Sequence, residues 1–298
     1  MIQPLVSVVI AVFNERLDFI VLAVESIRRQ TYSNLEIIVV NDNPASIEHK
    51  KLLHSFAGRD HRIVLLENDH NLGLTRSLNI GISCCNGKFI ARMDADDIAV
   101  STRIEKQLKY LELHQDVGLV GSAILNFNSK FAFRLQKFPE EHDQIVNELL
   151  LRNCLAHPTI LFRSSCLNLI NSDHFYNESF RVAQDYKLYV DLLKYTRFGN
   201  ISEPLLLYRR SSSQISAYRS EEQARNADIC RLELLEYLSL LNKGVYYSNL
   251  VRMKLFSKRN YSLNDLCSIW ISGDLKYLNV TSILRLLKRM LKTFLIKE

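Results

Sequence analysis

The sequence contains few residues that interrupt regular structure: of its 298 residues, nine are glycine and five are proline. This scarcity excludes long flexible linkers, and neither an internal repeat nor a low-complexity tract is present. Hydrophobic residues make up 47% of the chain and charged residues 23%, which is typical of a globular protein with a sizeable core.

Long apolar runs and paired cysteines are also missing. No uncharged stretch reaches the length of a membrane-spanning helix, and the first residues lack the basic and apolar segments of a secretion signal. None of the six cysteines forms a CxxC pair or a zinc-site spacing, which fits a reducing compartment. We therefore expect a cytoplasmic protein, either soluble or peripheral on the cytoplasmic face of the inner membrane.

The charge is only modestly biased, with a formal net charge of +6 and a pI near 8.9. This bias is compatible with an anionic substrate or a membrane surface. The basic residues are scattered or C-terminal and are not interleaved with aromatic residues, so we expect no nucleic-acid partner.

What is present is a regular alternation of strand and helix patterns. Valine-rich apolar runs and helical apolar spacings follow one another, with strands expected over residues 5–12, 35–40, 63–66 and 89–93, and helices over residues 19–29, 46–56 and 74–83. Repeated β-α-β units predict an α/β fold with an open, mostly parallel twisted sheet and helices on both faces. In such a sheet, ligands bind beyond the carboxyl ends of the strands.

The run Asp94-Ala95-Asp96-Asp97 directly follows the strand pattern over residues 89–93. Like charges this close repel one another unless a cation shares them, and Mg²⁺ or Mn²⁺ prefers oxygen ligands of this kind. The alternative is an acidic turn in which Asp97 or Ser101 caps the following helix. Polar or acidic residues also end the first two strands, at Glu15 and Asp42, which favours a functional crevice.

An ordered set of motifs then resembles family 2 glycosyltransferases of the GT-A (Rossmann-like) fold. The motifs span roughly residues 5–215 and comprise the run over residues 6–15, the strand end over residues 39–43, Asn71-Leu72-Gly73-Leu74 with Arg76 and Asn79, the DxD motif Asp94-Ala95-Asp96, and Ala183-Gln184-Asp185-Tyr186. The resemblance implies transfer of a sugar from a nucleotide-activated donor.

The resemblance also assigns the nucleotide-sugar site. In the family, the end of the first strand lines the nucleotide, and a carboxylate after the second strand accepts a hydrogen bond from the uracil imide. A position on the third helix lies near the base and phosphates, and the DxD motif lies near the ribose. The corresponding residues are Ala11, Phe13, Glu15, Asp42, Arg76, Asp94, Ala95 and Asp96. Asn41 departs from the family, which often has a second acid there. Arg76 could equally be a solvated helix residue.

By the same resemblance, Asp96 holds a Mg²⁺ or Mn²⁺ ion that bridges the donor diphosphate. His157 is a further candidate for contact with the donor or the metal. A bound cation stabilises the charge that develops on the departing diphosphate. Asp97 is expected instead to cap a helix over residues 102–113. His157, which precedes a proline before an expected strand over residues 159–162, has a structural role as its alternative.

The catalytic base of the family matches Asp185, in front of an expected helix over residues 186–195. A carboxylate there takes the proton of an acceptor hydroxyl in a single displacement that inverts the anomeric carbon. Gln184 stands where the family has a first acid, and an N-cap role for Asp185 competes with the catalytic one. We find no convincing second carboxylate for a covalent intermediate.

Near the end of the resemblance, Arg209 and Arg210 are candidates for diphosphate contacts or for solvent-facing strand residues. The Gln-x-x-Arg-Trp signature of processive synthases is absent, since the single tryptophan is Trp270. We therefore expect an enzyme that adds one sugar, with a catalytic domain over residues 1–219.

Residues 220–298 lie outside the resemblance and are expected to form a helical extension, with one helix over residues 222–241. A second helical pattern, over residues 280–297, carries an apolar face with basic residues beside it. Such a helix either lies on an anionic membrane or packs on the catalytic domain.

The expected function is therefore inverting, metal-dependent transfer from a nucleotide sugar, with UDP as the favoured nucleotide. The family resemblance implies a glycan acceptor, and contact with a membrane would suit an acceptor that is linked to a lipid. It also implies a role in the assembly of bacterial O-antigen, capsule or exopolysaccharide. The alternatives are a sugar nucleotidyltransferase and a non-catalytic sugar-nucleotide-binding subunit. A nucleotidyltransferase would need a glycine-rich phosphate loop after the first strand, and residues 12–15 do not form one.

Overall fold

The computed structural model describes residues 3–128, 132–170, 174–210 and 220–241. Its first half alternates strand and helix as predicted, with boundaries within two residues of those expected. The elements are β1 (Val6–Val12), α1 (Leu17–Arg28), β2 (Leu35–Asn41), α2 (Ile47–Ala57), β3 (Ile63–Glu67), α3 (Leu74–Ser83) and β4 (Phe89–Asp94).

The second half is less regular. It contains β5 (Ile98–Ala99), α4 (Arg103–Leu113), β6 (Val117–Phe127), β7 (Phe133–Gln136), α5 (His142–Leu149), the 3₁₀ helix η1 (His157–Thr159), β8 (Leu161–Arg163), the 3₁₀ helix η2 (Ser164–Asn168), α6 (Gln184–Leu192), β9 (Arg197–Arg209) and α8 (Ser220–Leu241). The strand expected over residues 159–162 is therefore wrong at its start, because His157–Thr159 forms a 3₁₀ turn and pairing begins at Leu161.

The strands of the described ranges join one sheet in the order β3-β2-β1-β4-β8-β6-β9-β5, with β7 pairing to β6. Strands β1 to β4 are parallel to one another, and so are β6 and β9, whereas β8, β7 and β5 pair antiparallel to their neighbours. The predicted open sheet is thus confirmed, and the antiparallel strands all come from the part of the chain after the acidic run.

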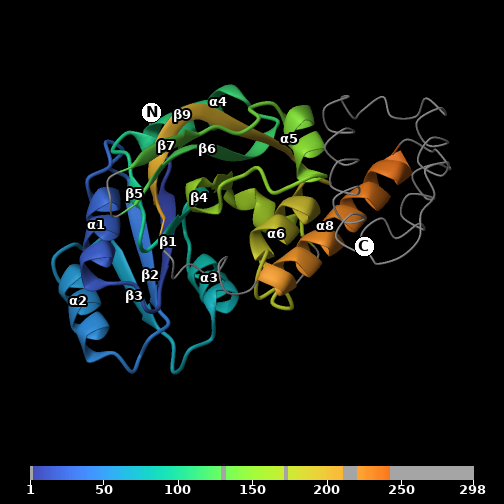
Figure 1. Cartoon of the computed structure of the whole chain (residues 1–298). Helices are drawn as coiled ribbons and strands as arrows, with labels where there is room; N and C mark the ends of the chain where they lie inside the picture. The colour runs from blue at the N-terminus through green and yellow to red at the C-terminus, as the bar shows by residue number, and fades with distance from the viewer. Residues whose placement is uncertain (1–2, 129–131, 171–173, 211–219, 242–298) are drawn as a thin grey trace.

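Helices cover both faces of this sheet, as expected (Figure 1). Because side chains alternate along a strand, Val8 and Ile10 of β1 pack in one apolar cluster with α1, α2 and α4, while Val9 packs in the other with α3. Gly81 lets α3 lie close to the sheet, since a Cβ there would be 2.7 Å from Val9 Cγ1. The second cluster continues into α5, α6 and α8.

The first helix of the predicted C-terminal extension packs against the catalytic part. Cys230 and Leu234 of α8 are fully buried in the same cluster as Tyr186 of α6, and Lys187 of α6 donates to Glu233 of α8 over 2.8 Å. The boundary after residue 219 remains a prediction, and the amphipathic pattern over residues 280–297 lies outside the described residues. Among the helices of the described ranges, none has the length and apolar character needed to cross a membrane.

Candidate active site

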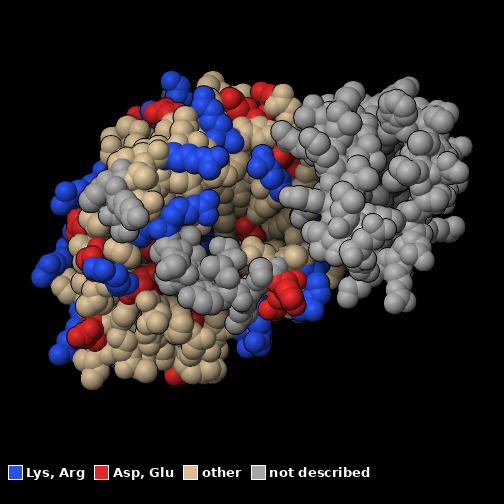
Figure 2. Space-filling model, in the orientation of Figure 1, with Lys and Arg blue, Asp and Glu red and all other residues tan. Residues whose placement is uncertain are grey.

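The ends of strands β1, β2 and β4 meet at one edge of the sheet. In the strand register Ala11 pairs with Asp94, and Val12 pairs with Asn41. The residues that follow these three strands therefore converge, as parallel pairing requires. Figure 2 shows a hollow in this side of the molecule, with acidic side chains inside it and Lys and Arg side chains on its border.

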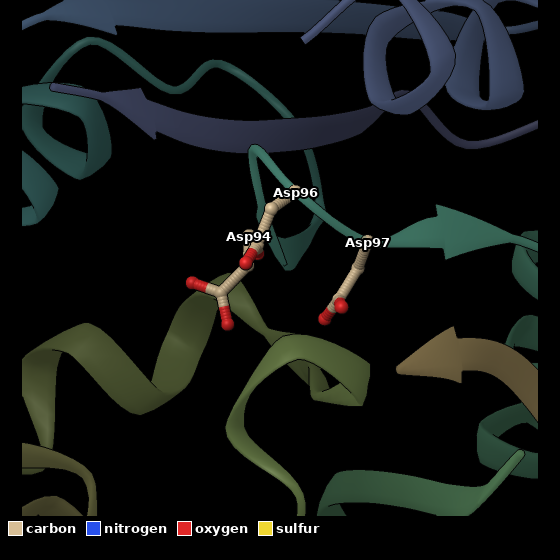
Figure 3. A group of neighbouring side chains, drawn as sticks. All are labelled: Asp94, Asp96 and Asp97. Carbon is tan, nitrogen blue, oxygen red and sulfur yellow. The ribbon is translucent and has the colours of Figure 1, made fainter. Parts of the chain in front are cut away.

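The acidic run gathers its carboxylates in one place. Asp94, Asp96 and Asp97 each present one oxygen such that the three oxygens lie within 4.8 Å of one another (Figure 3). Asp94 and Asp96 are partly exposed, Asp97 is fully buried, and the side chain of Ala95 lies in the core beneath the turn. An all-oxygen set of this kind fits a hard divalent cation such as Mg²⁺ or Mn²⁺.

Burial and mutual repulsion shift the proton affinities of this cluster. Burial, together with the charges of Asp94 and Glu15, raises the pKa of Asp96 to about 7. Burial and the charges of Asp94 and Asp96 raise the pKa of Asp97 well above its ordinary value. Burial likewise raises the pKa of Glu15. Without a cation, these carboxyls hold protons in a pH range where exposed aspartates are ionised.

Asp97 does not cap the following helix, so that expectation was wrong. Helix α4 begins at Arg103, its N-cap residue is Thr102, and no side-chain capping bond forms there. Instead Asp97 Oδ1 accepts a hydrogen bond of 2.8 Å from the backbone N–H of Arg209, at the end of β9. Asp97 Oδ2 is buried without a hydrogen-bond partner, which leaves it free to face a cation.

Both candidates for diphosphate contacts are arginines where β9 ends, and their side chains have different partners. They are Arg209 and Arg210. The Arg209 Nε–H donates to the backbone oxygen of Asp96 over 2.7 Å, so this side chain contacts the acidic turn itself. The exposed Arg210 donates through Nε to Asn126 Oδ1 over 2.8 Å and lies over the Tyr208 ring.

Two buried arginines were not singled out in the sequence. Arg92, inside β4, pairs with Asp94, and Arg103 of α4 donates to the backbone oxygen of Arg92 over 2.8 Å. Both side chains are buried, and burial lowers the pKa of Arg103 to about 9. The available signal was a charged residue within an otherwise apolar strand, because a fully buried charge requires a partner.

Asp42 is buried, and its carboxylate accepts hydrogen bonds from the segment of residues 68–73. Oδ1 accepts from Leu72 N–H and from Asn68 Nδ2, both over 2.7 Å, and Oδ2 accepts from Gly73 N–H over 2.9 Å. Gly73 is the N-cap residue before α3 and has a φ of +85°, a conformation that glycine adopts without strain. Asp42 thus organises the turn of residues 68–73 beside the end of β2, and its role toward a base stays a prediction.

The residues after β1 lie at the same edge. Phe13 is 45% exposed, and an accessible aromatic ring suits stacking on a base. Glu15 Oε2 accepts from the backbone N–H of Phe13 over 2.8 Å, so the two are held together. Ala11 is partly exposed beside them.

Arg76 is exposed on α3 and pairs with Glu178, with 2.9 Å between Nε and Oε2. Asn79, one turn further, exchanges two hydrogen bonds with the backbone of Tyr176, of 2.9 and 2.8 Å. The predicted motif on α3 therefore holds the segment around residue 176.

His157 is buried, and its Nε2 lies 2.7 Å from the Tyr176 hydroxyl. Burial lowers the pKa of His157 well below its ordinary value, so the ring is neutral. The three-carboxylate cluster does not include His157. Its observed contact is consistent with the structural alternative.

Asp185 lies in the first turn of α6, next to a strained backbone position. The helix begins at Gln184, and its N-cap residue is Ala183 with φ of +59°, an uncommon conformation for a residue with a side chain. Asp185 is thus not the N-cap. Its Oδ2 accepts from Asn153 Nδ2 over 2.7 Å, and burial raises its pKa.

Comparison with known proteins gives the family. The profile described as "Glycosyl transferase family 2" matches residues 7–177. The chain is 32% identical to an uncharacterized glycosyltransferase of Haemophilus influenzae, over 99% of this chain and 94% of that protein. It is 34% identical to the O-antigen biosynthesis glycosyltransferase WbnJ of Escherichia coli, over 72% of this chain and 84% of that protein.

Solved structures show the same fold. The complex of S. aureus TarS residues 1–349 with UDP-GlcNAc superposes with a TM-score of 0.61 at 14% identity, covering 78% of this chain and 71% of that chain. The resemblance seen in the sequence is therefore confirmed, and the chain belongs to glycosyl transferase family 2.

Proposed function

We propose that this glycosyltransferase is an inverting, divalent-metal-dependent enzyme that moves one sugar from a UDP-sugar to a hydroxyl group of a glycan. The observation that carries the proposal is the cluster of Asp94, Asp96 and Asp97 oxygens within 4.8 Å, at the edge of the sheet where ligands bind. Family membership supports the transfer of a glycosyl group.

The cation would be held by Asp96, with Asp94 and Asp97 beside it. Their oxygens and the unpartnered Asp97 Oδ2 suit Mg²⁺ or Mn²⁺, which usually keep waters and substrate phosphates in their shell. When bound, the ion supplies Lewis-acid stabilisation of the charge on the departing diphosphate. Proton-holding carboxyls in this cluster would exchange their protons for the cation.

Two observations support a UDP-sugar as the donor: the exposed Phe13 just after β1, and the fold. The TarS structure with the same fold contains UDP-GlcNAc. In this chain the exposed Phe13 ring would stack on the base, and Asp94 would lie near the ribose. WbnJ is described as an O-antigen biosynthesis enzyme, which supports surface-polysaccharide assembly as the pathway class.

The acceptor proton would go to Asp185. Residue Asp185 is only partly exposed, burial raises the pKa of its carboxyl, and Asn153 orients the carboxyl through the 2.7 Å hydrogen bond. Asp185 would accept the hydroxyl proton while the acceptor oxygen attacks the anomeric carbon from the face opposite the diphosphate. One displacement of this kind inverts the anomeric configuration.

We also propose that the acceptor is linked to a lipid and that the enzyme works at the cytoplasmic face of the inner membrane. The support for both is the basic amphipathic pattern over residues 280–297 in the sequence. Deletion of residues 278–298 is expected to lower sedimentation with anionic liposomes, and unchanged sedimentation would count against membrane contact.

The test is a screen of nucleotide sugars against glycan acceptors, with Mn²⁺ and with EDTA. We expect turnover with a UDP-sugar that requires Mn²⁺ and is lost in Asp96→Ala. The matched control is Asp116→Ala, because Asp116 is an exposed aspartate paired with Arg197 on the surface. Turnover that persists in EDTA, or in Asp96→Ala, would contradict the metal-dependent mechanism.

A further inference from the structure

The end of β9 is joined to the acidic turn by three independent contacts. Arg209 donates its backbone N–H to Asp97 Oδ1 over 2.8 Å and its Nε–H to the backbone oxygen of Asp96 over 2.7 Å. Immediately beyond the turn, Ile98 pairs with Leu207 in the antiparallel β5–β9 ladder. Arg209 therefore contacts both Asp96 and Asp97, although it lies more than a hundred positions later in the sequence.

The Arg209 side chain packs against two aromatic rings. Its Cζ lies 3.7 Å from the centroid of the Phe19 ring and 4.6 Å from that of Phe127. A planar guanidinium stacks on aromatic faces, and this contact restricts the plane in which its N–H groups can donate. The hydrogen bond to Asp96 is consequently held in one direction.

The position of the Asp96 peptide decides where its carboxylate points. The backbone oxygen of Asp96 belongs to the peptide group that joins Asp96 to Asp97, so a donor on that oxygen restrains the backbone between the two Cα atoms from which these carboxylates project. Metal affinity depends on such outer contacts, because carboxylates must be within a few tenths of an ångström of the coordinating geometry.

We propose that Arg209 is a positioning residue for the divalent cation: it holds the Asp96 peptide and the Asp97 carboxylate in the arrangement that binds the ion. The proposal rests on the proposed metal-dependent function. It differs from direct contact with the diphosphate, the role that the sequence suggested for Arg209, because its contacts are to the acidic turn itself.

The experiment measures Mn²⁺ binding without nucleotide, by electron paramagnetic resonance of the free ion, in the full-length protein. Arg209→Lys keeps the positive charge and loses the planar donor, so the change concerns geometry. We expect its Mn²⁺ affinity to fall roughly tenfold or more. The control Arg197→Lys, on the same strand in a surface ion pair with Asp116, is expected to bind Mn²⁺ as the wild type does.

A second, milder variant keeps the proposal testable if Arg209→Lys fails to fold. Phe19→Leu removes one ring of the stack and leaves the arginine in place, and we expect a smaller decrease in Mn²⁺ affinity with an unchanged circular dichroism spectrum. Wild-type Mn²⁺ affinity in both variants would overturn the proposal. So would unchanged Mn²⁺ affinity together with weakened UDP binding at saturating Mn²⁺, because that result indicates a diphosphate contact. Failure of the wild type to bind Mn²⁺ would instead contradict the proposed function.

Discussion

Arg92 and Asp94 form an ion pair between two positions of strand β4 whose side chains point to the same face, and the arginine side chain is only 3% exposed. The arginine is thus a buried positive charge directly beneath the acidic cluster. Its charge also lowers the pKa of Asp185, although burial outweighs this effect and the pKa is raised overall. The charge of Arg92 therefore acts on both the predicted metal site, through Asp94, and the predicted base, Asp185.

Substitution Arg92→Met is expected to lower the free energy of unfolding by roughly 2–4 kcal/mol, because it leaves the partly buried Asp94 carboxylate without its counter-charge. We expect kcat/KM to fall about 100-fold through misplacement of Asp94. Urea denaturation and steady-state kinetics measure the two effects. Arg29→Met, which removes an exposed pair with Glu25, is the control and should leave both nearly unchanged. Wild-type kinetics in Arg92→Met would contradict a role for this pair.

Substitution Asp185→Asn is expected to lower kcat by a factor of about 10³ or more, because the amide cannot accept the acceptor proton. Binding of the UDP-sugar should remain nearly unchanged when it is measured by calorimetry with Mn²⁺ present. Asp191→Asn is a matched control on the same helix, since Asp191 faces Lys187 over 2.7 Å. Rapid turnover by Asp185→Asn would remove Asp185 as the base.

Local patterns predicted the first half of the fold well, for identifiable reasons. Helix α3 has the predicted bounds, since its apolar spacing starts at Leu74 and the helix ends at Ser83, directly before the turn at Cys84. The convergence of Asp42 and Asp94 followed from parallel pairing alone.

The contacts that adjust the site could not be predicted, because they join distant parts of the chain. Asp97 resembled a helix cap in the sequence, yet its carboxylate bonds to a backbone group 112 positions later. Arg76 resembled a ligand-binding or solvated residue, and its partner Glu178 is 102 positions away. No local spacing rule contains such information. By contrast, the buried Arg92 could have been suspected, because an isolated charge in an apolar strand needs a buried partner.

Substitution Asn153→Ala is expected to move the acid limb of the pH profile of kcat/KM to higher pH. Asp185 acts as a base only when ionised, and the Asn153 amide stabilises the ionised form through its hydrogen bond. Loss of that donor raises the pKa of Asp185 further, because the ionised carboxylate loses a hydrogen bond that stabilises it. Activity should therefore recover at alkaline pH.

The control for this shift is Asn226→Ala, because the Asn226 amide donates to the backbone oxygen of Val182 rather than to a carboxylate. Its acid limb should coincide with that of the wild type. If Asn153→Ala instead loses the same fraction of activity at every pH, Asn153 acts by placing the side chain and not by stabilising its charge.

Mn²⁺ is expected to stabilise the protein more at about pH 8 than at about pH 5.5. The pKa of Asp96 is raised to about 7 from an ordinary value of 3.8, so its protonated form favours the folded state. That contribution is complete below the ordinary value and is lost as the pH rises through 7. At alkaline pH the folded protein therefore contains uncompensated carboxylates, and a divalent cation replaces the missing protons.

Thermal unfolding with Mn²⁺ and with EDTA at the two pH values measures this difference, with ionic strength matched by NaCl to exclude simple screening. In Asp96→Asn the Mn²⁺-dependent rise in Tm should be smaller and should depend less on pH, because one of the titrating ligands has gone. The metal assignment fails if Mn²⁺ raises Tm equally at both pH values, since proton and cation would then not compete for the same carboxylates.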